Sequence, residues 1–170
     1  MGLTIKPPAF NISLIMIKIR KAREEDLLKI AGLWRAFMRY NGDFNKSFET
    51  NKKASEIFSR EMLEKLKETE SRLAVAASDG ELIGFCYSYI SQKPKYFKLN
   101  KFGFIGDLYV SPEDRRNGVG KALVKDAIEF FKKNKIRQIE LLVAVKNEGT
   151  IKFWESLGFS HLLTWMYKRN

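Results

Sequence analysis

The sequence predicts an α/β domain built on one mixed β-sheet with helices on both faces. Two strand-like runs, the second rich in aromatic and β-branched residues, flank Asp79-Gly80, a pair that strongly favours a tight hairpin and hence antiparallel strands. In the second half of the chain, apolar strand-like runs alternate with segments of helical periodicity, which predicts parallel pairing there. The length of 170 residues suits a single domain that buries most of its apolar surface.

The beginning of the chain divides into two parts. Residues 1–15 contain Pro7-Pro8, which interrupts regular structure, and we interpret them as an upstream extension or a flexible arm. From Met16 the sequence Met-Ile-Lys-Ile-Arg alternates apolar and polar residues, as a half-buried strand does. Residues 16–170 are therefore expected to form the folded domain.

Two helices are expected next. Acidic residues in the segment 23–26 favour a helix start, because they complement the positive end of the helix dipole. Apolar residues then recur at helical spacing, namely Leu27, Ile30, Leu33, Trp34, Phe37 and Met38. A polar segment, residues 41–53, separates this helix from a second one over residues 54–67.

Three strands follow. Residues 73–77 and 81–91 form the two arms of the predicted hairpin, and residues 102–110 form a third strand that ends at Ser111-Pro112. The segment between the second and third strands, Gln92 to Lys101, is polar and rich in lysine, and we expect a loop there.

The last part of the chain alternates helices and strands. A helix is expected over residues 118–133, and the nearly continuous apolar run 138–145 resembles a strand buried on both faces. A short helix over 148–157 precedes Gly158, which is well placed as a C-cap, and residues 159–168 are expected to form the final strand.

Composition limits the classes of function. The net charge of +11 and the pI near 9.7 favour anionic partners, including a phosphate-bearing cofactor, although a lysine-rich solvated surface explains the same numbers. Cys86 is the only cysteine, which excludes an internal disulfide and a thiolate zinc site. No apolar run approaches the roughly 20 residues that span a bilayer, so we expect no membrane partner and a cytoplasmic protein.

The segment that begins at Asp107 carries the most chemical information. A strand runs into a turn with Gly118 and Gly120 and then directly into a helix, whose first amides are unpaired and positively polarised. A pyrophosphate suits such a helix end, and the nearby cations Arg115, Arg116 and Lys121 add to the attraction. An ordinary strand-to-helix turn remains the alternative. The spacing fits neither a Walker loop nor a dinucleotide fingerprint.

Two elements of the sequence resemble the GCN5-related N-acetyltransferase (GNAT) family. Arg115-Arg-Asn-Gly-Val-Gly120 matches the family signature Gln/Arg-x-x-Gly-x-Gly/Ala. Asn147-Glu-Gly-Thr-Ile-Lys-Phe-Trp-Glu-Ser-Leu-Gly-Phe159 resembles Asn-x-x-Ala-x-x-Phe-Tyr-Glu-x-x-Gly-Phe. The two elements occur in the expected order, one strand-helix unit apart, and the resemblance extends over residues 16–167.

The resemblance implies a single mixed, mostly antiparallel sheet whose central parallel pair splays apart to admit acetyl-CoA. The residues expected at the cofactor are Leu108, Val110, Arg115, Arg116, Asn117, Gly118, Val119, Gly120, Lys121, Asn147, Phe153 and Trp154. Backbone groups of Leu108 and Val110 would bond the pantetheine arm as an added strand does. Amides of residues 116–121 would hold the pyrophosphate, and Asn147 would brace the arm. Phe153 and Trp154 would pack beside the cofactor, with plain core packing as the alternative.

The chain departs from the family pattern at two catalytic positions. Trp154 stands where many members have a tyrosine that acts as the general acid, and an indole N–H cannot supply a proton near neutral pH. Gly106 stands where many members have a glutamate. We therefore take Asp107 as the candidate base and Tyr109 as the candidate acid, with water or Tyr167 as alternative proton donors. Asp107 as an ordinary structural carboxylate remains the competing interpretation.

The resemblance predicts an N-acetyltransferase that moves acetyl from acetyl-CoA to a primary amine of a small molecule or protein by direct attack. A non-catalytic acyl-CoA-binding or regulatory domain is the alternative, and Gly106 and Trp154 favour it more than a typical member would. A nucleic-acid-binding role through residues 93–101 is a third, less favoured interpretation. No metal is expected, and a homodimer is an open alternative.

The acceptor is expected to contact residues 40–56 and 92–101, because loops on a rigid scaffold commonly carry selectivity. The net positive charge of the whole chain argues weakly against polyamine acceptors, because like charges repel. Small amines, amino acids and protein amines remain open as acceptors.

Overall fold

The computed structural model describes residues 16–168. The sheet strands are β1 (Lys18–Lys21), β2 (Ser71–Ser78), β3 (Glu81–Gln92), β4 (Lys101–Val110) and β5 (Ile139–Leu141). The α-helices are α1 (Leu27–Gly42), α2 (Ala54–Lys65), α3 (Val119–Lys133) and α4 (Glu148–Ser156). Short 3₁₀ turns cover Glu24–Asp26, Lys46–Phe48 and Pro112–Asp114. The expected extension, residues 1–15, lies outside the described residues.

The five strands form one mixed sheet in the order β1-β2-β3-β4-β5. The first three pairings are antiparallel, and β4 and β5 are parallel. The β2–β3 hairpin turns at Asp79-Gly80 as predicted, with both residues at positive φ (49° and 83°). This conformation matches the twist of a two-residue hairpin and explains the glycine.

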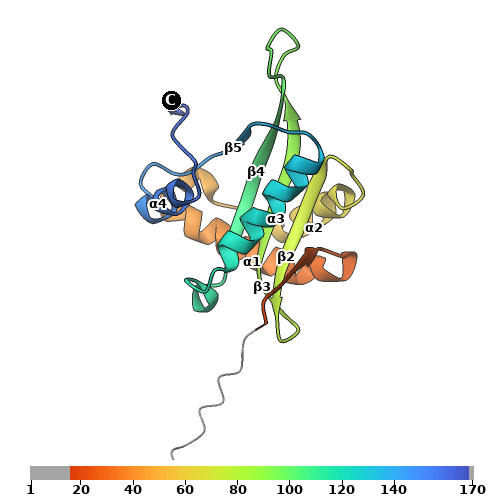
Figure 1. Cartoon of the computed structure of the whole chain (residues 1–170). Helices are drawn as coiled ribbons and strands as arrows, with labels where there is room; N and C mark the ends of the chain where they lie inside the picture. The colour runs from red at the N-terminus through yellow and green to blue at the C-terminus, as the bar shows by residue number, and fades with distance from the viewer. Residues whose placement is uncertain (1–15, 169–170) are drawn as a thin grey trace, which may run out of the picture.

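Helices cover both faces of the sheet and enclose two separate cores, as expected. Figure 1 shows α3 crossing one face, while α1 and α2 lie behind the strands. The α1/α2 core contains Phe58, Phe85, Tyr87 and Tyr109, and the α3 core contains Leu123, Phe131 and Trp154. A half-buried ion pair joins the layers: Arg72 on β2 donates to both carboxylate oxygens of Asp126 on α3, at 2.9 and 2.7 Å.

A β-bulge interrupts the pairing of β3 with β4. Tyr87 lies opposite Asp107 and Ser88 opposite Ile105, so Gly106 has no partner residue on β3. A bulge bends a strand and increases its twist. The bend occurs where the pairing of β4 with β5 stops, because that pairing covers only residues 103–105 of β4 and 139–141 of β5.

In the second half, one predicted strand is shorter than expected and the other does not form within the described residues. The run 138–145 forms a strand only over Ile139–Leu141, and residues 159–168 belong to no strand or helix. The parallel pair therefore lies at the edge of the described sheet rather than at its centre. The physical reason is that apolar sequence alone does not make a strand: residues 142–145 have no ladder partner once β4 bends away, and Leu142 and Val145 are exposed.

Among the described helices, none is long and apolar enough to cross a membrane.

Candidate active site

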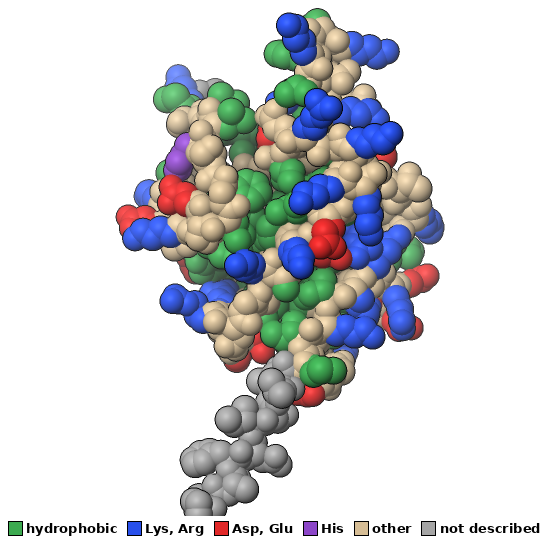
Figure 2. Space-filling view, viewed as in Figure 1, with side chains coloured by type: hydrophobic (Ala, Val, Ile, Leu, Met, Phe, Trp, Pro, Cys, Tyr) green, Lys and Arg blue, Asp and Glu red, His purple; other side chains and the backbone are tan. Residues whose placement is uncertain are grey.

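The bent part of β4 forms one wall of an opening. Within residues 16–168, no strand pairs with the β5-facing edge of β4 beyond Ile105. Figure 1 shows the segment after β5 and the helix α4 beside this edge of β4. Figure 2 shows hydrophobic side chains gathered between α4 and α3 on this face of the molecule. Leu108, Val110, Val143 and Phe153 are partly buried there against the α3 core.

The N-terminus of α3 lies beside this opening and is uncapped. Its N-cap, Gly118, has φ +80°, and no side chain accepts a hydrogen bond from the first turn. The first hydrogen bond into the helix runs from the Ala122 amide to the Gly118 carbonyl at 3.0 Å. The amides of residues 119–121 precede it, and none donates to another described residue. Unpaired amides, the helix dipole and exposed Arg116 and Lys121 make this end suitable for a phosphate.

The two glycines of this loop serve different purposes. A Cβ on Gly118 would meet nothing within 4 Å, so glycine is needed there for its left-handed backbone. A Cβ on Gly120 would lie 3.4 Å from the Phe153 ring and 3.8 Å from Val110. Gly120 thus permits close packing of α3 against α4. The sequence predicted both glycines at the cofactor, and the geometry leaves open space at Gly118 alone.

The Arg115 side chain turns away from the α3 amides. Its Nε donates to the Val110 carbonyl at 3.0 Å. Its guanidinium lies over the rings of Tyr40 and Tyr109, with centroid distances of 5.3 and 5.6 Å. These three side chains line a cavity of about 260 Å³ between the end of α1 and the loop before α3. Arg115 thus fixes the loop to β4 and α1, and it already occupies the Val110 carbonyl that sequence reasoning assigned to the cofactor.

Asn147 caps α4 and contacts α1. Its buried Oδ1 accepts from the Thr150 amide at 3.2 Å and from the Tyr40 hydroxyl at 3.4 Å. Its Nδ2 donates to no other described residue, which leaves this amide for a ligand. Sequence reasoning placed Tyr40 among the aromatic residues near the acceptor and missed its link to Asn147, because 107 residues separate the two in the chain.

Asp107 and Tyr109 share the face of β4 that points toward α1. Asp107 lies directly opposite Tyr87, and Tyr109 opposite Phe85, both members of the α1/α2 core. Burial raises the pKa of Asp107 to about 6, and no described residue donates a hydrogen bond to its carboxylate. A carboxylate with this pKa is ionised at neutral pH and is basic enough to accept a proton. Tyr109 is 7% exposed and its ring packs against Phe37.

Trp154 is 6% exposed and packs edge-on against Phe153 and Phe159, with ring centroids 5.1 Å apart in each pair. Its place beside the cofactor stays a prediction, because these contacts already account for a large apolar side chain. Tyr167, the alternative acid, lies in the exposed segment after α4.

The other reactive side chains offer no competing centre. Cys86 is fully buried in the α3 core, and burial raises the pKa of its thiol, so it is not a thiolate. Between residues 16 and 168, no three His, Cys, Asp or Glu side chains lie together as a metal site.

Comparisons with known proteins agree with this arrangement. The acetyltransferase (GNAT) family profile matches residues 32–159. An uncharacterized N-acetyltransferase of Methanocaldococcus jannaschii is 32% identical over 144 residues, which are 83% of this chain and 59% of that protein. An N-alpha-acetyltransferase of Sulfurisphaera tokodaii is 31% identical over 108 residues, 59% of this chain and 63% of that protein. The chain therefore spans only part of the length of these curated relatives.

The fold also matches solved structures. A predicted acetyltransferase of Clostridium acetobutylicum, solved with acetyl-CoA, superposes with a TM-score of 0.71 at 18% identity, covering 91% of this chain and 96% of that one. The fold, the glycine-bearing start of α3 and the family match over residues 32–159 lead to one conclusion: the chain belongs to the acetyltransferase (GNAT) family.

Proposed function

We propose that this protein transfers the acetyl group of acetyl-CoA to a primary amine of a small molecule or protein. The observation that carries the proposal is the uncapped N-terminus of α3, which begins at Gly118 beside the unpaired edge of β4. Family membership supports the reaction class, and the acetyl-CoA bound to the Clostridium acetobutylicum protein supports the choice of co-substrate. The single, buried Cys86 fits the reducing cytoplasm that we propose as its location.

The chain has groups that fit each part of acetyl-CoA. Amides of residues 119–121, with the cations Arg116 and Lys121, would hold the pyrophosphate. The free edge of β4 at residues 106–109 would bond the pantetheine amides as a partner strand does, and Nδ2 of Asn147 would donate from the opposite wall. A backbone N–H of residues 108–110 would polarise the acetyl carbonyl.

Asp107 would supply the base for the transfer. The neutral amine nitrogen forms a bond to the acetyl carbonyl carbon, and the bond from that carbon to the CoA sulfur breaks. The proton that leaves the nitrogen passes to the Asp107 carboxylate directly or through water, and the sulfur gains a proton from Tyr109 or water. Holding the amine and thioester in contact contributes roughly 7–11 kcal/mol on its own, so a strong acid is not required.

Two glycine variants test the cofactor site. Gly118→Asp adds negative charge at the proposed pyrophosphate position, and Gly80→Asp is its matched control: both glycines have φ near +80° and open space at the Cβ position, but Gly80 lies in the distant β2–β3 turn. Calorimetric titration with acetyl-CoA should show binding to the wild type and to Gly80→Asp, and none to Gly118→Asp. Equal affinities in all three would refute the loop assignment.

A CoA-release assay on a panel of primary amines tests the reaction itself. We expect thiol release that depends on both acetyl-CoA and an amine. Tight acetyl-CoA binding without turnover on any amine would instead indicate an acyl-CoA-binding domain without catalysis.

A further inference from the structure

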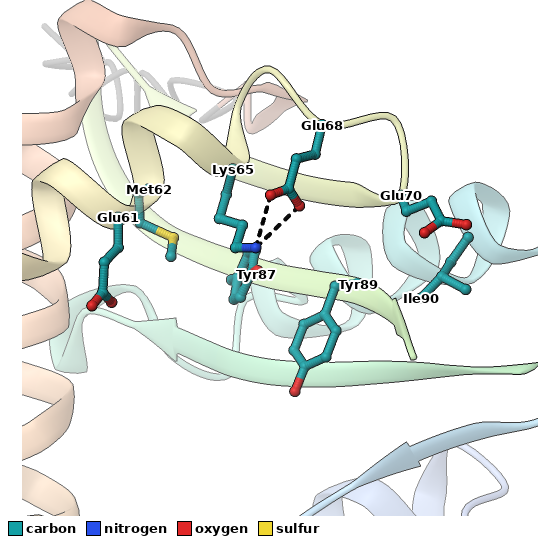
Figure 3. A pocket seen from close by; sticks show the side chains of 8 residues that line it. All are labelled: Glu61, Met62, Lys65, Glu68, Glu70, Tyr87, Tyr89 and Ile90. Carbon is teal, nitrogen blue, oxygen red and sulfur yellow. Dashed lines mark hydrogen bonds and ion pairs between the residues drawn. The ribbon is translucent and has the colours of Figure 1, made fainter. Parts of the chain in front are cut away.

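A cavity of about 380 Å³ lies between the second half of α2 and β3, on the α1/α2 face of the sheet. Figure 3 shows its lining: acidic side chains from α2 and the turn before β2 on one side, and the Tyr87 and Tyr89 rings from β3 on the other. None of these residues belongs to the two GNAT motifs.

The cavity is acidic although the chain as a whole carries a net charge of +11. Its lining includes Glu61, Glu68 and Glu70 but only one cation, Lys65. Lys65 Nζ bonds both carboxylate oxygens of Glu68, at 2.8 and 3.1 Å, and Lys101 approaches Glu70 at 3.3 Å. Glu61 has no ion-pair partner among the described residues. Negative charge therefore remains after the neighbouring lysines are counted.

Tyr87 contributes a hydroxyl group to the lining of the cavity. Its side chain lines the cavity, the residue is 8% exposed, and its hydroxyl bonds no other described residue. Ser55 is the one described residue whose buried side-chain polar atom lacks a partner, so the Tyr87 hydroxyl is accessible from the cavity, where a ligand can reach it. Burial raises the pKa of Tyr87, with Glu68, Asp107 and Glu61 adding to the shift, so negative potential converges on this hydroxyl.

The cavity adjoins the proposed reaction centre. A Cβ on Gly106 would lie 3.4 Å from the Tyr87 ring and 3.5 Å from the Tyr89 ring, so both rings lie over the bulged residue of β4. The next residue, Asp107, is the cross-strand neighbour of Tyr87. Gly106 has no side chain, so this position places no side-chain atoms between the cavity and the carboxylate of Asp107, the proposed base.

We propose that this cavity receives the acceptor, and that the acceptor is an aliphatic amine with a second positively charged group. The inference rests on the proposed acetyl transfer and specifies its substrate class. The tyrosine rings would pack against the methylene chain and face its cations, while the carboxylates would hold the distal ammonium. The overall positive charge, which argued against polyamines, acts at long range and is screened by salt, whereas the cavity acts at contact distance.

A matched pair of amines tests the second charge. Pentylamine and 1,5-diaminopentane share a chain length and a primary amine, and they differ in one terminal ammonium. We expect kcat/KM for the diamine to exceed that for the monoamine by about tenfold, the effect of one charge-assisted contact. Spermidine and a lysine-containing peptide amide are assayed in parallel. A higher kcat/KM for one of them shows whether the natural acceptor is a free polyamine or a protein lysine.

Two variants of α2 connect this preference to the cavity. Glu61→Gln should reduce the preference for the diamine by about threefold to tenfold. Glu64→Gln is the matched control, because Glu64 is on the same helix, pairs with Lys67 and does not line the cavity. Tyr87→Phe should raise KM for the diamine more than for pentylamine while acetyl-CoA affinity stays unchanged.

The outcomes separate this inference from the proposed function. Equal kcat/KM for the two amines, or the same loss of preference in Glu61→Gln and Glu64→Gln, would overturn the acceptor site while leaving acetyl transfer intact. If no amine is acetylated, calorimetric binding of 1,5-diaminopentane to the CoA-loaded protein still decides: tighter binding than pentylamine, weakened in Glu61→Gln only, supports the site. Equal binding of both amines overturns it.

Discussion

The hydroxyl of Tyr40, near the end of α1, lies 3.4 Å from the side-chain oxygen of Asn147, the residue that caps α4. The contact joins two segments that flank the opening beside β4. The same Tyr40 ring lies under the Arg115 guanidinium, which in turn bonds the Val110 carbonyl. One aromatic side chain thereby positions both the loop before α3 and the start of α4.

Tyr40→Phe tests this connection, because it keeps the ring under Arg115 and removes the bond to Asn147. We expect the free energy of unfolding to fall by about 1 kcal/mol or less, since the bond is long and half-buried. Acetyl-CoA affinity should fall several-fold, because α4 loses a contact that holds it in place. Tyr96→Phe, on the exposed β3–β4 loop, is the control and should change neither quantity. Unchanged affinity in Tyr40→Phe would contradict the positioning role.

Asn147 caps α4, and two substitutions separate this role from the cofactor contact that we propose for its Nδ2. Asn147→Asp retains an oxygen that caps α4 but removes the Nδ2 donor, so stability should be nearly unchanged while acetyl-CoA binds more weakly. Asn147→Ala removes both and should also lower the free energy of unfolding by about 1 kcal/mol. Chemical denaturation and calorimetry measure the two effects. A fully active Asn147→Asp protein would show that this residue is only a helix cap.

Gly120→Ala tests the packing of α3 against α4. The new methyl group would lie 3.4 Å from the Phe153 ring, at the lower limit of an ordinary contact, so we expect a loss of about 1 kcal/mol or less in unfolding free energy. Phe153→Leu in the same chain should recover part of this loss by making room. If Gly120→Ala instead abolished acetyl-CoA binding at unchanged stability, the glycine would be serving the phosphate, as the sequence suggested.

The pH profile of the reaction should report Asp107, whose pKa burial raises to about 6. The base is the ionised form, so kcat/KM should show a limb with a pKa of about 6, separate from the rise at higher pH that comes from deprotonation of the amine, and Asp107→Asn should lose this limb and most of the activity. The free energy of unfolding should change in the opposite direction and fall as the pH rises. The folded protein binds this proton more tightly than an unfolded chain with a pKa near 3.8, so this residue contributes less stability as the pH rises from about 4 to 6. A profile with the same limb in Asp107→Asn would exclude this base.

Local signals in the sequence predicted much of the fold. The Asp79-Gly80 turn, the helix start at Gly118 and the C-cap at Gly158 depend on backbone conformations that glycine and its neighbours determine within a few residues. The family resemblance also located the α3 loop correctly. The direction of the Arg115 side chain was not predictable in this way, because its partners Tyr40 and Val110 come from other elements.

The final strand fails as a prediction for a related reason. Residues 159–168 have an apolar composition that suits a strand, yet Leu162, Leu163 and Trp165 are exposed and the segment joins no ladder. Strand formation requires a neighbour with free backbone groups in register, and composition does not report whether such a neighbour is present.

The sequence by itself determined the family, the hairpin, the layered α/β architecture and the glycine-bearing start of α3, because each is specified by residues close together in the chain. Only the tertiary structure decided which glycine faces open space and which packs against Phe153, how Tyr40 joins Asn147, and that two tyrosine rings of an acidic cavity lie against Gly106. Those features arise where α1, α2, β3 and β4 meet, and their charges and distances depend on packing between segments far apart in the sequence.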